Sequence, residues 1–392
     1  MTVDELLKIK PDMPSAETVE KAIQKWNSVA KPIGGLGEFE KIITHIAGIH
    51  GKEEFDLDRR ALVIMIADNG IVDEGVSQSE SDVTLKVAKL MTEDKSSVGE
   101  MIHGIAVSGG SYIDTFPVDI GIKNGTPIGG RIINAKIRAG SRNFMMEPAM
   151  NLRETMKAVE TGISIVGRLA EEGYDIIATG EMGIGNTTTC SALLAELLRL
   201  PVETLTGHGA GLSEEGYAYK CDVIKRALAK YDLNEDIFSL SVKLKEADPD
   251  AFEGDIPDMQ MINKLHALAA LTTFGGYDIA GLAGVFIGGA IHHMPIVMDG
   301  VISVTAAYVA EKMVPGVKEY VIPSHMGSEP AMREVFEEMG LTLKPVIRAG
   351  LHLGEGTGAV MLFPMLDMAM SLYKSGSTFS ELKMDPYKNF TE

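Results

Sequence analysis

The hydrophobic positions of the chain form short continuous runs of strand length, each followed by a polar or glycine-rich loop and then by a helical pattern. The first run, ALVIMIA (61–67), ends in Asp-Asn-Gly (68–70). Similar runs recur along the chain at 116–121, 175–180, 295–300, 320–325 and 345–350. Near-continuous apolar strands that alternate with helices predict an α/β fold, with a parallel sheet covered by helices on both faces.

The two ends of the chain fall outside this alternation. Residues 15–50 have the three- and four-residue apolar spacing of a helix, and the stretch 377–390 has neither pattern. We therefore predict a small helical domain built from residues 1–58 together with about 375–392. The large α/β domain, residues 59–374, would carry the active site.

Composition narrows the class of partner. Against 36 Lys and Arg stand 55 Asp and Glu, which leaves a net charge of −19. Binding to a phosphate backbone needs clustered basic residues, so we expect no nucleic-acid partner. An acidic chain is also repelled by anionic membrane surfaces.

The sequence also favours a cytoplasmic location. Its two cysteines, Cys190 and Cys221, are not in a CxxC pair, which is typical of a reducing compartment. The first residues lack the apolar core of a secretory signal. The charge-free run between Asp278 and Asp299 approaches the length of a membrane span but holds four Gly, two His and a Pro. We interpret it as a buried glycine-rich helix followed by a short strand.

The loops after the apolar runs carry the candidate chemistry. In parallel sheets, ligands bind beyond the carboxyl ends of the strands. Five loops there are rich in glycine and short polar residues: DNG (68–70), GEMGIGNT (180–187), MDG (298–300), SHMGSE (324–329) and GEGTG (354–358). Their expected convergence on one edge predicts an enzyme or a small-ligand binder.

The loop at 180–189 lies between a strand and the start of a helix. Exposed backbone N–H groups and the helix dipole favour an anion such as a phosphate there. The loop lacks the Gly-Lys-Ser/Thr of a Walker motif. The alternative is a tight turn with Asn186 or a following Thr as helix cap. Glu181 beside a phosphate points instead to a polar, non-phosphate part of a ligand.

Two further loops have both a functional and a structural interpretation. Ser324 and the residues after it offer N–H and hydroxyl donors for an anion, or else a serine of this segment caps a helix whose first turn contains Glu329. Glu355 stands among three glycines, where partial desolvation would suit it as a general base. The alternative is a first-turn glutamate that complements the helix dipole.

Other polar residues carry weaker signals. Lys220 is either a surface lysine or a counter-charge for a phosphate. Three aspartates follow strands, at Asp68, Asp119 and Asp299, and we interpret them as turn caps rather than as Mg²⁺ ligands. The spacings of zinc motifs are absent from the sequence, so we expect no metal and no cofactor.

Taken in order, these motifs resemble the nicotinate-nucleotide–dimethylbenzimidazole phosphoribosyltransferases (the CobT family). The likeness covers nearly the whole chain, from KPIGGLGEFE (31–40) to LGEGTGAV (353–360). Between these lie ADNGIVDEGVS (67–77), PVDIG (117–121), RAGSRNF with EPAM (138–150), GEMGIGNTTT (180–189), GHGAGLSEEG (207–216), PIVMDGVI (295–302) and SHMGSEPAM (324–332). One such motif would be weak, but the whole series in one order is specific.

The resemblance implies a fold and a reaction. The fold is a Rossmann-like parallel sheet with a small helical domain, usually in a homodimer. The reaction transfers the 5-phosphoribosyl group of nicotinate mononucleotide to an aromatic lower-ligand base of cobamides. Nicotinate leaves, and the anomeric carbon inverts from β to α.

The resemblance also implies residue roles. Glu355 matches the general base that takes the proton of the azole, and Glu181 would stabilise the ribosyl cation or hold a ribose hydroxyl. The pocket for the acceptor base is expected near Ser77. Asp68 is a further candidate substrate-binding residue. Gly354, next to the general base Glu355, is a further expected substrate contact. The expected phosphate contacts are Gly183, Ile184, Gly185, Asn186, Thr187, Lys220, Ser324, His325, Gly327 and Ser328.

Two segments depart from the family pattern. QSESDVTLKVAKL (78–90) is more polar than usual, and residues 91–110 differ from the usual Asn- and Ala-rich version. Both would lie near the acceptor pocket, so the acceptor stays open. A branch that accepts phenol or p-cresol, and that works as a heterodimer of homologous chains, is an alternative. A weakly active partner subunit is another.

Overall fold

The computed structural model describes residues 1–124, 128–247 and 257–387. Its centre is a six-stranded sheet in the order β3-β2-β1-β4-β5-β6, and each pair of neighbours is parallel. The strands are β1 (Arg60–Ala67), β2 (Ile113–Gly121), β3 (Ile133–Asn134), β4 (Ile176–Met182), β5 (Ile296–Met298) and β6 (Val321–Pro323). This order confirms the predicted Rossmann-like α/β fold. It reverses between β1 and β4, where folds of this kind bind ligands.

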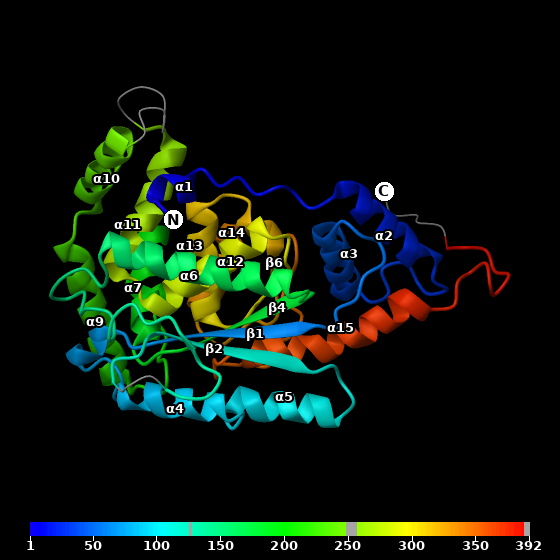
Figure 1. Ribbon diagram of the computed structural model, residues 1–392, viewed down its shortest axis with the longest axis horizontal. Coiled ribbons are helices and arrows are strands. Elements are labelled where there is room, and N and C mark those ends of the chain that lie inside the picture. The colour runs from blue at the N-terminus through cyan, green and yellow to red at the C-terminus, as the bar shows by residue number, and fades with distance from the viewer. Residues whose placement is uncertain (125–127, 248–256, 388–392) are drawn as a thin grey trace.

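Helices cover both faces of the sheet. α4 (Asp82–Thr92) and α5 (Ser97–Val107) lie below it in Figure 1, and α6 (Leu152–Glu171), α12 (Tyr277–Ile291) and α13 (Val301–Met313) lie above it. At one end of the molecule gather α7 (Asn186–Leu198), α9 (Glu214–Lys230), α10 (Leu233–Ala247) and α11 (Met259–Phe274). The remaining helices are α1 (Val3–Leu7), α2 (Ala16–Ser28), α3 (Glu38–His50), η1 (Gly70–Glu74), α8 (Val202–Leu205), η2 (Val317–Tyr320), α14 (Ala331–Met339) and α15 (Thr357–Ser375).

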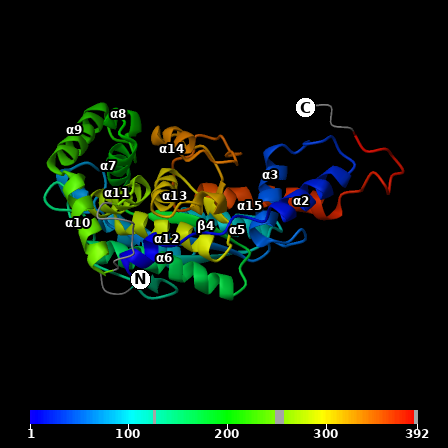
Figure 2. The same ribbon diagram turned by 90° about the horizontal axis from the view of Figure 1, so that it is seen from above.

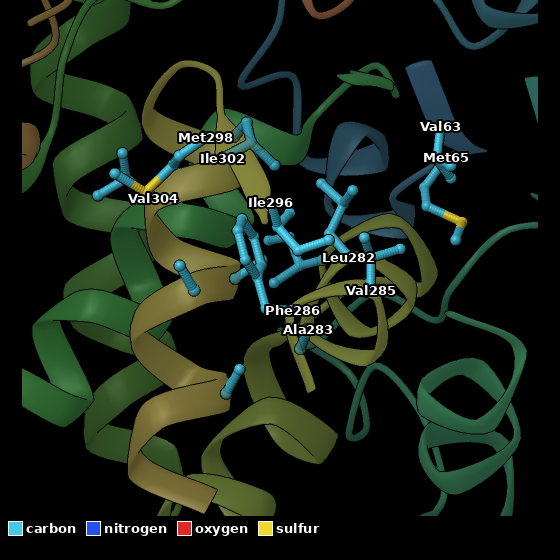
Figure 3. Close-up of a cluster of buried hydrophobic side chains, with 14 of the residues drawn as sticks. Val63, Met65, Leu282, Ala283, Val285, Phe286, Ile296, Met298, Ile302 and Val304 are labelled. Atoms are coloured by element: carbon cyan, nitrogen blue, oxygen red, sulfur yellow. The ribbon is translucent and has the colours of Figure 1, made fainter. Parts of the chain in front are cut away.

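The glycine-rich helix α12 is the centre of the core, as its charge-free sequence predicts. Its side chains pack with those of β1, β5 and α13, and Figure 3 shows this cluster around Leu282 and Phe286. On its other side α12 touches α6 backbone to backbone. A Cβ atom on Gly162 of α6 would overlap the carbonyl oxygen of Gly281, and one on Gly284 would overlap that of Val159. Only glycine permits this approach.

Two predicted elements differ from the structure. Residues 15–50 form two helices, α2 and α3, because Gly34 and Gly37 adopt positive φ angles in the turn between them. The run 345–350 is not a strand of the sheet, and only Ile347 forms an isolated bridge, to His325. Pro345 has no N–H to donate, and Gly350 turns the chain with φ of 65°.

The division into two domains stays a prediction, and several contacts support it. α2 and α3 lie with the far end of α15 and the C-terminal segment, away from the sheet (Figures 1 and 2). Ala30 N–H donates to Ser377 O at 2.8 Å, and the Trp26 ring packs on Tyr373 at 5.0 Å. α1 instead lies against α11, where Lys264 donates to Leu7 O at 2.6 Å. The small domain is therefore better begun at α2. The end of its second segment, 388–392, lies outside the described residues.

Candidate active site

The five loops named from the sequence meet at the carboxyl edge of the sheet. The loop after β1 bonds to the loop after β4, through Asn69 N–H and Ile184 O at 3.2 Å. Ser324, after β6, donates its hydroxyl to Met298 O at the end of β5, at 2.6 Å. GEGTG lies against β4, since a Cβ atom on Gly180 would stand 2.6 Å from Glu355 O. The expected convergence of loops therefore occurs within one chain.

Glu355 is buried and held in a strained conformation. Its φ is 59°, in the left-handed region that non-glycine residues rarely adopt and that is found most often at functional sites. Its Oε2 accepts the backbone N–H of Val98, in the first turn of α5, at 3.1 Å. The alternative of a first-turn glutamate is wrong, because α15 begins at Thr357 and Glu355 precedes it. Asp299 takes the first N–H groups of that helix instead, including Gly358 at 2.8 Å.

Glu181 lies in a cluster of acidic side chains on four different elements. Its Oε2 accepts the amide N–H of Asn186, and a Cβ atom on Gly354 would lie 2.6 Å from its Oε1. Burial, together with the charges of Asp278, Asp299 and Glu355, raises the pKa of Glu181 to about 8. Near neutral pH this carboxyl group is therefore largely protonated and can donate a hydrogen bond.

Lys220 is fully buried, so the interpretation as a surface lysine is wrong. Its Nζ donates to Thr187 Oγ1 and to Gly207 O, both at 3.1 Å. Burial lowers the pKa of Lys220, and the nearby carboxylate of Glu329 partly offsets this effect. The Thr187 hydroxyl accepts from Lys220, so its own proton is available to another acceptor.

The start of α7 is an open helix terminus. Its N-cap is Gly185 with φ of 91°, and no side chain caps it, so neither Asn186 nor a Thr is the cap. The N–H groups of Asn186 and Thr188 donate to Gly183 O and Gly185 O, and Thr187 and Lys220 stand beside them at this terminus. A helix N-terminus beside a lysine and a hydroxyl is suited to a phosphate.

Ser324 and His325 are both buried, and their hydrogen bonds fix the histidine tautomer. The single proton of Ser324 goes to Met298 O, so His325 Nδ1, 2.9 Å from Ser324 Oγ, must be the donor. Burial lowers the pKa of His325 to about 4, which leaves Nε2 unprotonated. His325 can therefore only accept a hydrogen bond through Nε2. Neither serine of the segment 324–329 caps a helix, because α14 begins at Ala331 with Pro330 as its N-cap.

The remaining sequence candidates lie around this centre. Gly327 and Ser328 line a cavity of about 760 Å³. Ser77 is partly exposed and accepts the N–H of Ser79 at 3.2 Å. Asp68 is buried and accepts the N–H of Lys123 at 2.7 Å, a bond that joins the end of β1 to the residues after β2 rather than capping a turn of its own.

Sequence reasoning missed one acid of the site and its partners. Asp278, the second residue of α12, is fully buried and accepts the side-chain amide of Asn69 at 3.3 Å. The only signal was an aspartate two positions after a glycine pair, at a helix start. Among the described residues, no cluster of three or more His, Cys, Asp or Glu side chains could hold a metal ion. Over the same ranges, no helix combines the length and the apolar character needed to cross a bilayer.

Known proteins resemble this chain over nearly its whole length. A family model described as phosphoribosyltransferase (DBI_PRT) matches residues 12–244 and 256–383. The nicotinate-nucleotide–dimethylbenzimidazole phosphoribosyltransferase of Ruminiclostridium cellulolyticum is 36% identical over 388 residues, 99% of each chain. That of Acetivibrio thermocellus is 38% identical over 372 residues, 95% of each. The crystal structure of CobT from Thermus thermophilus superposes with a TM-score of 0.80 at 29% identity, covering 95% of this chain and 100% of that one.

Proposed function

Because the chain belongs to the nicotinate-nucleotide–dimethylbenzimidazole phosphoribosyltransferase family, we propose that it transfers the 5-phosphoribosyl group of nicotinate mononucleotide to an aromatic lower-ligand base. The observation that carries this proposal is the contact between the loop of Glu355 and the end of β4, which carries Glu181, at the switch point of the sheet. This contact brings Glu355, the candidate general base, next to Glu181, the candidate ribose contact, and both lie beside the candidate phosphate site at the start of α7.

The proposed donor site follows the polarity of these side chains. The phosphate binds at the start of α7, where Thr187 and Lys220 offer donors, and Ser328 adds a hydroxyl from the neighbouring loop. Glu181, protonated near neutral pH, donates to a ribose oxygen. His325 presents only an acceptor, so within its segment it is suited to a ligand hydroxyl rather than to phosphate oxygens.

In the proposed transfer, the substrates and Glu355 account for every bond, electron pair and proton that moves. The bond from C1′ to the pyridinium nitrogen breaks, and its electron pair stays on the leaving nicotinate. The azole nitrogen attacks C1′ from the opposite face, which gives the α product. The azole N–H proton passes to Glu355, whose position is fixed by Val98 N–H.

One observation keeps a phenolic acceptor as a second candidate. Val98, which holds Glu355, belongs to the segment 91–110 that departs from the family pattern. A phenol also loses a proton on transfer, so the same base serves both acceptors. The chain can be tested against dimethylbenzimidazole, adenine, phenol and p-cresol, with the anomer of each product read by NMR.

We propose that the enzyme works as a dimer, either of two copies or with a homologous chain. Purified chain with nicotinate mononucleotide and dimethylbenzimidazole tests the activity and its requirement for a partner. Nicotinate release without another protein supports an enzyme that needs no homologous partner, and release only after addition of a homologue supports the heterodimer. Failure with every acceptor and partner would refute the proposed transfer.

A further inference from the structure

Asp278 is a buried carboxylate at the switch point of the sheet, between the loops that follow β1 and β4. Its side chain is 0% exposed, and its Oδ1 accepts the backbone N–H of Ile279 at 3.0 Å. Two glycines make room for it. A Cβ atom on Gly183 would lie 2.7 Å from Oδ2, and one on Gly276 would lie 2.5 Å from Oδ1. The loops from β4 and into α12 therefore both leave space for this carboxylate.

One asparagine side chain contacts Asp278, and a second contacts Glu181. Asn69 Oδ1 accepts the hydroxyl of Thr189 at 3.1 Å, which turns its Nδ2 toward Asp278 Oδ2 at 3.3 Å. Asn186 donates its amide to Glu181 Oε2. Asp278 Oδ2 lies against Gly183, whose carbonyl oxygen accepts the backbone N–H of Asn186 at 3.2 Å, and the Asn186 side chain also acts to lower the pKa of Asp278.

The carboxylate of Asp278 is unfavourable for stability. Burial outweighs its hydrogen bonds and raises the pKa of Asp278 to about 6. An asparagine has the same shape and would bury no charge, but it keeps an oxygen for only one of the two donors, Ile279 N–H and the Asn69 amide. An ionisable group at such a position, within the candidate site, is typical of function rather than of packing.

We propose that Asp278 is a positioning residue, which orients the Asn186 amide and through it turns the Oε1 of Glu181 toward the ribose of the phosphoribosyl donor. The inference rests on the proposed function, because it deepens the role given there to Glu181. Asn186 occupies Oε2, so Oε1, on the side of Gly354, is the atom left to face a ligand.

The charge of Asp278 has a second effect on Glu181. Of the three acids that raise the pKa of Glu181, Asp278 acts most strongly, ahead of Asp299 after β5 and Glu355 before α15. Opposed to them is the neutral amide of Asn186 on α7. Asp278 therefore keeps Glu181 protonated, as a donor to the ribose requires, up to a higher pH than its neighbours alone would.

The test compares Asp278→Asn with Asp278→Ala in the full chain. Asp278→Asn keeps an oxygen for one of the two donors and removes the charge, so Glu181 should ionise about one pH unit lower. The alkaline limb of nicotinate release should move to lower pH by that amount, and kcat should fall about tenfold or more. Asp278→Ala, which removes the oxygens as well, should lose more activity.

A second measurement reads Glu181 without relying on turnover. The infrared band of its protonated carboxyl group, identified by its loss in Glu181→Gln, should titrate near pH 8 in the wild type and lower in Asp278→Asn. An unmoved band would overturn the inference, whether or not the chain turns over. A lower melting temperature with an unmoved limb would likewise leave Asp278 with a purely structural role. Absence of turnover in the wild type, with a shifted band, would count against the proposed function alone.

Discussion

Gly354→Ala tests the geometry of the site without removing any chemical group. Gly354 joins the loop of Glu355 to the carboxyl group of Glu181, and its φ is 85°. A Cβ atom there would stand 2.6 Å from Glu181 Oε1. The substitution therefore forces the Glu181 carboxyl group to move, while both acids stay in place in the sequence.

The size of the displacement follows from the contact distance. Ordinary van der Waals contact begins at 3.4 Å, so Glu181 Oε1 must shift by about 3.4 − 2.6 = 0.8 Å. Misplacement of a catalytic group by about 1 Å costs roughly 10²-fold in rate, so kcat/KM should fall about 10- to 100-fold. The left-handed backbone adds a stability cost of about 1–2 kcal/mol for any residue with a Cβ.

Gly350→Ala is the matched control. Gly350 lies in the same loop with φ of 65°, but a Cβ atom there would meet nothing within 4 Å. Both variants should lose similar stability in thermal unfolding, and only Gly354→Ala should lose nicotinate release. If the two variants have the same kcat/KM, the position of Glu181 does not limit the reaction.

Three further perturbations address single groups. Glu355→Gln still offers an oxygen to Val98 N–H, so donor affinity should hold while kcat falls about 10²–10⁴-fold; an unaltered kcat would remove Glu355 from the mechanism. Lys220→Ala should raise KM for nicotinate mononucleotide more than it lowers kcat, because phosphate is held alike in the ground and transition states; an unchanged KM would contradict a phosphate contact. Stability should fall as pH rises from about 4 to 8, because Glu181, with its raised pKa, holds a proton in the folded chain that the unfolded chain has lost. Melting temperatures at about pH 5 and pH 8 should differ less in Glu181→Gln, and an equal difference would contradict the raised pKa.

The sheet and the meeting of the loops could be predicted because their signals are local. A run such as 61–67 is apolar throughout, since both faces of a parallel strand are buried, and the loop after each strand lies by geometry at the same edge. The run 345–350 has the same appearance but begins at Pro345, which cannot donate to a ladder. The apolar pattern alone does not show that this backbone N–H is missing.

The partners of the site acids could not be predicted because they come from distant parts of the chain. Val98 and Glu355 are 257 residues apart, and Asn69 and Asp278 are 209 apart. The burial of Lys220 depends on how α9 packs against α7, which one helix pattern does not specify. The tautomer of His325 likewise depends on the carbonyl of a neighbouring strand.

The close contact of α6 with α12 makes the geometry of the active site depend on packing in the core. Gly284 is six residues beyond Asp278, about 9 Å along the helix axis, and it rests directly on the backbone of Val159. An added methyl group there would displace α12 as a rigid rod and carry its first turn along. Loss of turnover after a substitution at that glycine would therefore indicate that α12 has moved, and not that a contact with substrate has been lost.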